Sequence, residues 1–227
     1  IEKESFKEIY KNYPDIKASD FFKNLGLEKD PDIKKEFEKM LSEDKVISDF
    51  EFSEEYEAIL HSQIFANKCL KAASTQRNLF IKYLSDMKID YQNEGLYIVD
   101  IGYSGTSQKN ISRIFQNQVT IHAYYMICEA MINTFSKNNF VYGILYDCNR
   151  NDFGKIYKYN ETVIESLLLA SHSSVVGYMF DNDIVKPEFS TNHEEMNCYH
   201  NVIVPIQKNI FSIFDLITML VKNSKRD

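Results

Sequence analysis

Residues 96–115, LYIVDIGYSGTSQKNISRIF, change their pattern halfway and thereby decide the fold class. Apart from Asp100, the first six residues form an apolar run with β-branched members, which predicts a buried strand of a parallel sheet. After the glycines, Ile111, Ile114 and Phe115 recur at helical spacing. We therefore expect a strand, a tight glycine loop and the start of a helix.

Outward from this segment, the chain alternates between strand and helix patterns. Apolar β-branched runs predict strands at 119–127 and 140–146, and a leucine-rich stretch predicts a helix at 161–170. Residues 175–180 and 184–189 flank Asp181-Asn182-Asp183, which predicts a β-hairpin. This order predicts an α/β fold, a Rossmann-like domain with a mainly parallel sheet over residues 91–227.

Residues 1–90 show helical spacing throughout and predict a helical N-terminal region, unless the whole chain forms one continuous domain. Ser19 or Asp20 is expected to cap a short helix that Gly26 ends. Asp30-Pro31 is expected to open another helix, and residues 54–87 form a long helical stretch. Near the C-terminus, residues 203–221 predict an amphipathic helix packed on the core.

Composition places the chain among soluble globular proteins. It has 227 residues, 44% of them hydrophobic, and a net charge of −7, which argues against general nucleic-acid binding. Its four cysteines lie far apart, as in a reducing compartment, so we expect a cytoplasmic location. With no run of 18 apolar residues, we expect no membrane span. The sequence begins at Ile1, and we expect an upstream domain of the same protein.

The glycine loop is the best candidate for a ligand site. Gly102 lets the chain leave the strand sharply, and Gly105 lets backbone approach a ligand. Thr106 or Ser107 is expected to cap the next helix, whose unpaired N–H groups suit a phosphate or another anion. Asp100 ends the strand, where α/β sheets place functional groups, and either contacts a ligand or caps the loop itself. Beyond these, Gln108 is either a ligand donor or an exposed polar residue.

Three known loop types differ from this one in specific ways. A P-loop requires a lysine that this loop lacks. In actin-like kinases the loop joins two strands, whereas here a helix pattern follows. The methyltransferases that use S-adenosylmethionine share the strand, D-x-G-x-x-G and helix, but their second strand usually ends in an acidic residue. Here Glu129 lies beyond the expected end of that strand, so this alternative is weakened and stays open.

Residues 98–108, IVDIGYSGTSQ, resemble the V-D-x-G-[WY]-x-G-[ST]-x-Q signature found in the C-terminal part of haloacid-dehalogenase-like hydrolases of bacterial capsule and lipopolysaccharide gene clusters. Residues 73–84 and 163–178 resemble the flanking stretches of that family. The resemblance covers about residues 55–190. It implies a role in cell-surface glycan assembly, with a phosphorylated sugar or a nucleotide-sugar as the ligand. A glycosyltransferase-like role is implied only by analogy.

The catalytic motif of haloacid dehalogenases, D-x-D-x-[TV], is missing from this sequence, because Asp100 is followed two residues later by Gly102. Any phosphatase activity is therefore expected upstream of Ile1. The chain is then either a ligand-binding part of an enzyme or a non-catalytic module that positions a partner catalytic domain. The sequence names no cofactor.

Further candidates lie outside the loop or at its tip. Glu165 is a candidate acid–base residue on the helix of residues 161–170, four residues after Glu161, and the alternative is a salt-bridged or capping role. His172 follows in a polar turn and is a second candidate base, or a plain loop histidine. Tyr103 is a candidate for stacking on a base or sugar, while Ser104 lacks the neighbours of a nucleophilic triad. The pair His193 and His200 has no recognisable metal motif, so we expect no metal site.

Overall fold

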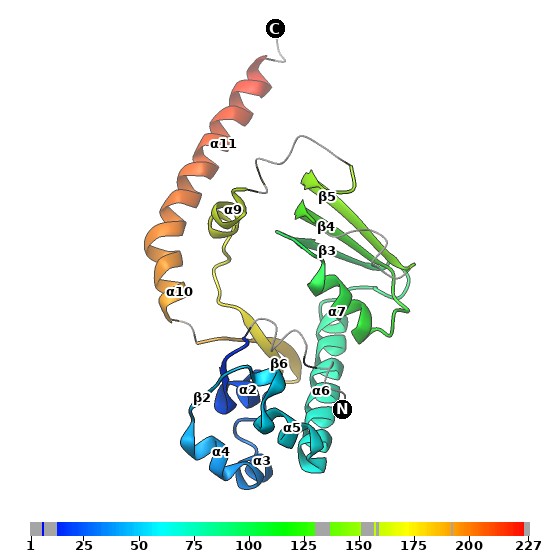
Figure 1. Ribbon diagram of the computed structural model, residues 1–227. Helices are drawn as coiled ribbons and strands as arrows, with labels where there is room; N and C mark the ends of the chain where they lie inside the picture. The colour runs from blue at the N-terminus through cyan, green and yellow to red at the C-terminus, as the bar shows by residue number, and fades with distance from the viewer. Residues whose placement is uncertain are drawn as a thin grey trace. The chain divides into compact units, whose positions relative to one another are not determined.

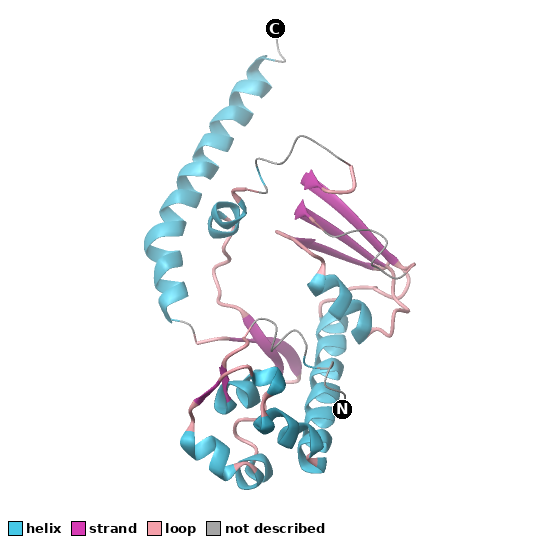
Figure 2. Ribbon diagram, in the orientation of Figure 1, coloured by secondary structure: helices cyan, strands magenta, loops and turns pink. Residues whose placement is uncertain are grey.

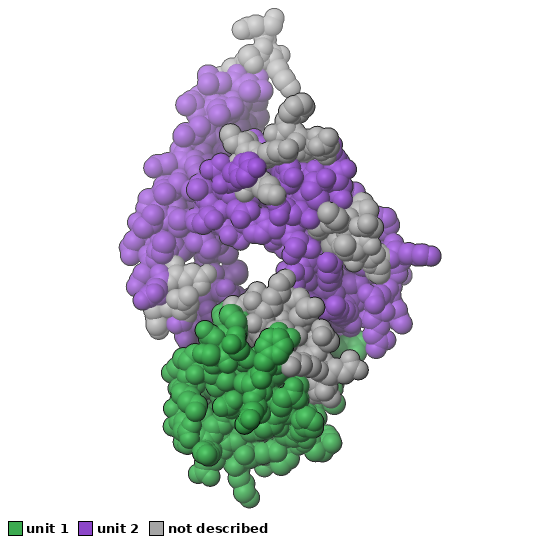
Figure 3. Space-filling model, viewed as in Figure 1, with its two compact units in different colours: residues 1–79 green, residues 80–227 purple. Residues whose placement is uncertain are grey.

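The computed structural model describes residue 6 and residues 13–129, 137–150, 157, 159–191 and 193–224. The chain divides into two compact units, residues 1–79 and 80–227, which Figure 3 colours separately. The division falls before the expected boundary at residues 90 and 91. The reason is that Phe80 and Leu84 pack with Leu96 and Phe115 of the second unit. Residues 1–5 and 7–12, at the start of the expected helical region, lie outside the described residues.

Short helices make up most of the first unit (Figure 1). In chain order its elements are β1 (Ile16–Lys17), α2 (Ala18–Asn24), α3 (Pro31–Glu36), α4 (Glu38–Glu43), β2 (Val46–Ile47), the 3-10 turn η2 (Phe50–Phe52), α5 (Glu54–His61) and most of α6 (Gln63–Asp86). The two strands pair antiparallel. The expected long helix at 54–87 is thus two helices, because α5 ends at His61 and Ser62 is extended.

Local capping confirms two of the predicted helix ends. Gly26 follows α2 with φ +69°, and its N–H donates to Lys23 O at 2.9 Å, as in a Schellman motif. Asp30 accepts from the N–H groups of Asp32 and Ile33 at 2.9 and 3.2 Å, so Asp30-Pro31 does open α3. The predicted capping of α2 by Ser19 or Asp20 is wrong, since Lys17 holds the cap position.

Aromatic rings fill the core of the first unit. Phe21, Phe22, Phe50, Tyr56 and Phe65 are completely buried. Their ring centroids lie 4.9–6.1 Å apart, the distance range of favourable edge and tilted ring packing. The many phenylalanines and tyrosines of residues 1–79 therefore serve largely to hold this unit together.

A three-stranded parallel sheet forms the centre of the second unit (Figure 1). Its order is β3 (Leu96–Asp100), β4 (Ile121–Cys128), β5 (Asn139–Asp147), with Leu96 opposite Ile121 and Ile121 opposite Asn139. Helix α7 (Thr106–Ile114) connects β3 to β4. The predicted mixed α/β fold with a parallel sheet is thus confirmed, and the three strands lie where the apolar runs place them.

Only one face of this sheet is buried, which corrects the prediction that the first strand is buried throughout. The face with Leu96, Ile121 and Ala123 belongs to the core. On the other face Tyr97 is 61% exposed and Val99 is 77% exposed. Parallel sheets are usually covered on both faces. Here the second face is solvent-exposed and carries a row of stacked rings: Tyr97, His122 and Phe140, with centroids 4.7 and 4.9 Å apart.

The remaining elements include the expected hairpin (Figure 2). Helix α9 (Glu161–Leu167) precedes β6 (Val175–Asp181) and β7 (Ile184–Phe189), which pair antiparallel. Asn182 and Asp183 both have positive φ, +49° and +69°, as a two-residue type I′ turn requires. The hairpin predicted around Asp181-Asn182-Asp183 is therefore confirmed. Asp86 at the end of α6 accepts from the N–H of Val185 at 3.0 Å.

The C-terminal helix runs through α10 (His193–Cys198), the π-helical segment η4 (Tyr199–Ile203) and α11 (Val204–Ser224). It was expected to pack on the core, and that expectation is wrong. By length and composition alone, Met196–Lys222 is able to cross a membrane, with a mean hydropathy of 1.4 in its most apolar window. Only 6% of that window is buried. Gln207 fixes its beginning by donating to the carbonyls of Leu167 and Leu169 at 2.9 and 3.1 Å.

Candidate functional site

The glycine loop joins β3 to α7, as expected, but the start of the helix differs from the prediction. Gly105 holds the N-cap position with φ +74°, and no side chain caps the helix. Thr106 was expected to cap it and instead lies in the first turn, where its hydroxyl meets that of Ser104 at 3.1 Å. The first-turn N–H groups of α7 have no intrahelical acceptor, since the first such bond runs from Lys109 N to Gly105 O. This is the chemistry of an anion cradle.

Gly102 is required by the close approach of a neighbouring strand. A Cβ on Gly102 would lie 2.5 Å from the carbonyl oxygen of Ile127. The loop runs beside the end of β4, because Ile127 N donates to Ile101 O and Glu129 N donates to Tyr103 O, both at 2.9 Å. The two loop glycines therefore have different tasks. Gly102 allows close packing on β4, and Gly105 allows the left-handed turn into α7.

Asp100 lies at the carboxyl end of β3, partly buried beneath the loop. One of its carboxylate oxygens lies 3.4 Å from the N–H of Gly102, a long contact that leaves most of its acceptor capacity for other donors. Its charge acts on two phenols. Burial is the main cause that raises the pKa of Tyr125, and the negative charge of the Asp100 carboxylate contributes to the same shift. Both expected roles for Asp100, loop capping and ligand contact, remain compatible with this position.

The structure brings Glu165 to the glycine loop. Burial, then the negative charges of Glu165 and Glu161, raise the pKa of Tyr103 to about 12, and Asp100 adds a smaller effect. The Tyr103 hydroxyl is enclosed and lies near Glu165 without reaching it in ordinary hydrogen-bond geometry. Helix α9 thus supplies carboxylates to the same place as the end of β3. The negative charges of Glu165, Glu161 and Asp100 all act on this phenol, so the end of the loop is rich in hydrogen-bond acceptors.

Gln108 has a role that the sequence did not suggest. It is completely buried, and its amide nitrogen donates to Asn139 Oδ1 at 3.1 Å and to Phe140 O at 3.2 Å. The Tyr125 hydroxyl donates to its side-chain oxygen at 3.2 Å. Neither expected role, as an exposed residue or as a ligand donor, fits these contacts. We assign Gln108 to tying α7 to β4 and β5.

The contacts of His172 lie outside the cluster of Asp100, Tyr103 and Glu165. Its side chain is exposed, its Nδ1 lies 3.0 Å from the carbonyl oxygen of Ser173, and its ring packs on Phe189 with centroids 4.7 Å apart. It belongs to the base of the β6–β7 hairpin. His200 contacts Tyr199, and the side chain of His193 lies outside the described residues. Within the described part of the chain, no three His, Cys, Asp or Glu side chains gather as metal ligands would.

Glu129 is the residue that sequence reasoning misplaced. It lay beyond the expected end of the second strand at residue 127. The structure extends β4 to Cys128, so Glu129 follows the strand directly and pairs by its N–H with the loop carbonyl of Tyr103. In dinucleotide-binding α/β folds, an acidic residue about 20 positions after the glycine loop contacts a ribose hydroxyl. Glu129, directly after β4, occupies a comparable position. The signal was available in the apolar residues that continue to Cys128.

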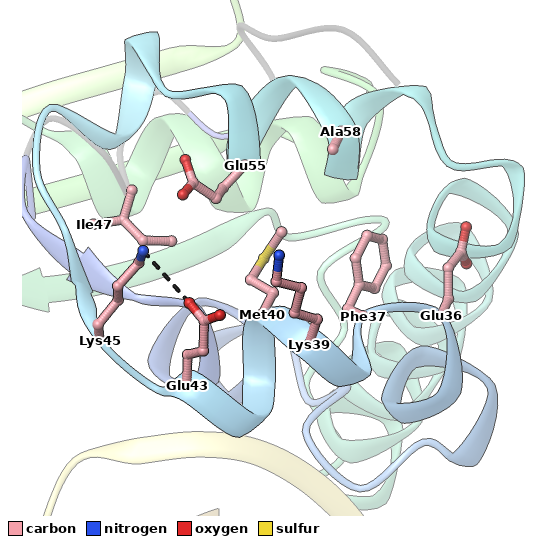
Figure 4. Close-up of a pocket in the computed structure, with 9 residues that line it drawn as sticks. All are labelled: Glu36, Phe37, Lys39, Met40, Glu43, Lys45, Ile47, Glu55 and Ala58. Carbon is pink, nitrogen blue, oxygen red and sulfur yellow. Dashed lines mark ion pairs between the residues drawn. The ribbon is translucent and has the colours of Figure 1, made fainter.

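A separate cavity lies within the first unit and was not expected from the sequence. It has a volume of about 480 Å³ and is lined by helices α3, α4 and α5, by β2 and by Lys45. In Figure 4, Lys45 and Glu43 form an ion pair of 3.4 Å at one side, and Phe37 and Met40 supply an apolar wall. Its lysines and glutamates nearly balance in charge, so it favours no single class of charged ligand.

Comparison with known proteins adds no assignment. No model of a known protein family matches the sequence. No curated protein matches it significantly either.

Proposed function

We propose that this protein binds a phosphorylated sugar or a nucleotide-sugar at the loop of residues 100–108, as part of bacterial cell-surface polysaccharide synthesis in the cytoplasm. The observation that carries the proposal is the pairing of two opposite chemistries at one loop. The uncapped N-terminus of α7 offers N–H donors, and Asp100 and Glu165 offer carboxylate acceptors. A sugar phosphate presents the matching acceptors and donors in one molecule.

The anionic end of such a ligand fits the helix start. Backbone N–H groups and the helix dipole favour a phosphate even in a chain with a net charge of −7. Gly105, by its left-handed φ of +74°, brings backbone to this position with no Cβ. Thr106 and Ser104 add hydroxyl groups at the same end of the loop.

The sugar end fits the carboxylates. Ionised carboxylates accept hydrogen bonds from hydroxyls strongly, and Asp100 keeps acceptor capacity beyond its long contact with Gly102. Glu129 follows β4 directly and its N–H donates to Tyr103 O of the loop, a position that suits a ribose and favours a nucleotide-sugar over a simple sugar phosphate. The fold supports the same ligand class, since β3, α7 and β4 are a parallel strand–helix–strand unit of the kind that binds nucleotides in Rossmann-like domains, to which we propose that this unit belongs.

The proposal gives this chain the task of holding and orienting the ligand. Its resemblance to proteins of capsule and lipopolysaccharide gene clusters supports the biological context, and because the sequence carries no D-x-D-x-[TV] motif, the proposal assigns no dehalogenase-type step to these residues. Glu165, an exposed carboxylate whose charge reaches Tyr103, is the group that we propose to exchange a proton with a bound hydroxyl. The role of a module that positions a catalytic partner is consistent with the same binding site.

A methyltransferase-like enzyme is the second candidate. The observation that favours it is the position of Glu129 directly after β4, where those enzymes hold a ribose. S-adenosylmethionine carries a ribose but no phosphate. Its binding would therefore leave the start of α7 without an anion.

Isothermal titration of the full chain distinguishes these candidates with three probes: UDP-glucose, S-adenosylmethionine and inorganic phosphate. We expect UDP-glucose to bind, and phosphate to compete with it. The variant Gly105→Val should abolish binding. Gly26→Val is the matched control, because Gly26 has nearly the same φ, +69° against +74°, and lies outside the site.

Each remaining outcome is decisive. Binding of S-adenosylmethionine alone would replace the proposal by the methyltransferase candidate. Binding of UDP-glucose that survives Gly105→Val would remove the loop from the site. The absence of binding by all three probes would contradict the proposed ligand class.

A further inference from the structure

The outer part of α11 carries an apolar surface exposed to solvent. From Phe211 to Val221 every apolar side chain is at least 49% exposed. By contrast, Ile203 at the start of the helix is only 5% exposed, and Gln207 is bonded to the carbonyls that follow α9. The chain thus fixes the beginning of the helix and leaves its remaining turns exposed. A continuous apolar surface of this length marks an interaction site.

The spacing of its residues is that of a helix–helix seam. Alternating steps of three and four separate the apolar side chains Ile203, Ile206, Ile210, Ile213, Ile217 and Leu220. In heptad terms the isoleucines at 203, 210 and 217 occupy position a, and the residues at 206, 213 and 220 occupy position d. Isoleucine at both positions favours assemblies of three or four helices over pairs. Leu216 and Phe214, at the flanking g and e positions, widen the seam as such assemblies require.

The charged residues of α11 follow the same period on the opposite face. Lys208, Asp215 and Lys222 are each seven residues apart and occupy position f, the outermost position of a helical bundle. All are exposed. Their placement leaves the seam from Ile206 to Leu220 entirely apolar, over about four turns, and keeps the outer face in water. Sequence spacing and exposure therefore point to the same interface.

We infer that α11 assembles with the α11 helices of further copies of this chain, forming a bundle along the seam of Ile206, Ile210, Ile213, Ile217 and Leu220. A second copy is the occupant that the heptad favours, because a helix of the same period presents the same a and d side chains to the seam. This inference is independent of the ligand proposed for the glycine loop.

Two other occupants fit the observations less well. In a membrane, Asp215 would lie within the apolar stretch, where a charge is costly, and the seven-residue period of the charges would have no purpose. The exposed face of the sheet around Val99 is another apolar surface of this unit. A helix that docks on a flat sheet face needs only one broad apolar stripe, so such docking would not require isoleucine at alternating steps of three and four.

The test measures the mass of the full chain in solution by light scattering during size exclusion, over a range of micromolar concentrations. We expect a particle of three or four times the chain mass of 26.6 kDa. Ile217→Asp, at an a position, should give monomers. Met219→Asp is the matched control, since Met219 is equally exposed, 52% against 50%, and lies outside the seam. Val99→Asp should leave the assembly intact.

The other results overturn the inference. A monomeric wild-type chain would do so, and so would an assembly that survives Ile217→Asp. If both α11 variants lose binding to phosphatidylcholine–phosphatidylglycerol vesicles equally, the helix is a membrane element. If Val99→Asp and Ile217→Asp each dissociate the assembly into monomers, α11 docks on the sheet face of another copy.

Discussion

Replacing Gln108 by leucine is expected to destabilise the second unit strongly, even though leucine has a similar size and suits a buried position. The side chain is completely buried and takes part in three hydrogen bonds, to Asn139, to Phe140 O and from Tyr125. Each buried hydrogen bond contributes about 0.5–1.5 kcal/mol net, and a partner left unsatisfied costs about 1–3 kcal/mol. Three such losses amount to roughly 3–6 kcal/mol.

Burial of the leucine side chain offsets part of this loss, by about 1.5–3 kcal/mol at most. We therefore expect Gln108→Leu to lower the free energy of unfolding by about 1.5–3 kcal/mol. For a chain of this size that corresponds to a fall in Tm of roughly 3–12 °C. Far-ultraviolet circular dichroism during thermal and urea unfolding measures both quantities.

Two further variants make the test specific. Ser107→Ala changes the exposed neighbour on the same helical turn and should alter stability by less than about 0.5 kcal/mol. Tyr125→Phe removes only the donor to Gln108, so its effect should be largely absent when Gln108 is already leucine. If Gln108→Leu unfolds like the wild type but loses ligand binding, the structural role assigned to Gln108 is refuted.

Three further predictions concern the loop and the first unit. Glu165→Gln should lower the pKa of Tyr103 from about 12 towards its ordinary value of 10, as followed by ultraviolet titration of the phenolate. Because the folded-state pKa is raised in the wild type, any stability that this group contributes is lost as the pH rises from 10 to 12. Gly102→Ala should cost more than about 3 kcal/mol or prevent folding, since its Cβ would meet Ile127 O at 2.5 Å. Asp30→Ala should cost about 0.5–2 kcal/mol through loss of the α3 cap. A hydrogen bond from Lys68 lowers the pKa of Asp30, so the difference from wild type should be present at neutral pH and shrink as the pH falls below about 4.

Matched variants guard each of these results. Glu161→Gln should lower the pKa of Tyr103 less than Glu165→Gln does, and the reverse order would contradict the placement of α9. Gly26→Ala has a left-handed φ but meets no atom within 4 Å, so it should cost only about 1–2 kcal/mol. Equal costs at Gly26 and Gly102 would remove the close approach of β4 as the cause. A constant effect of Asp30→Ala down to pH 2 would show that the carboxylate charge is not involved.

Elements whose patterns are local follow directly from the amino-acid sequence. The apolar runs gave the strands at 96, 121 and 139 within two residues, because strand formation follows from β-branched side chains in succession. The hairpin around Asn182 and the cap at Asp30 were equally accessible, since each depends on the conformational preference of a few adjacent residues. The glycine loop belongs to this group.

Which side chains meet, and which surfaces stay exposed, depends on the tertiary structure. Tyr103 and Glu165 are far apart in sequence and become neighbours through the path of the chain, while His172, seven residues after Glu165, turns away to Phe189. Gln108 is polar and near a loop, yet it is buried because Asn139 and Tyr125 satisfy its amide. The apolar pattern of α11 was visible in the sequence, but not that it stays uncovered. A pattern fixes the face that a helix offers, and burial depends on whether another surface is there to meet it.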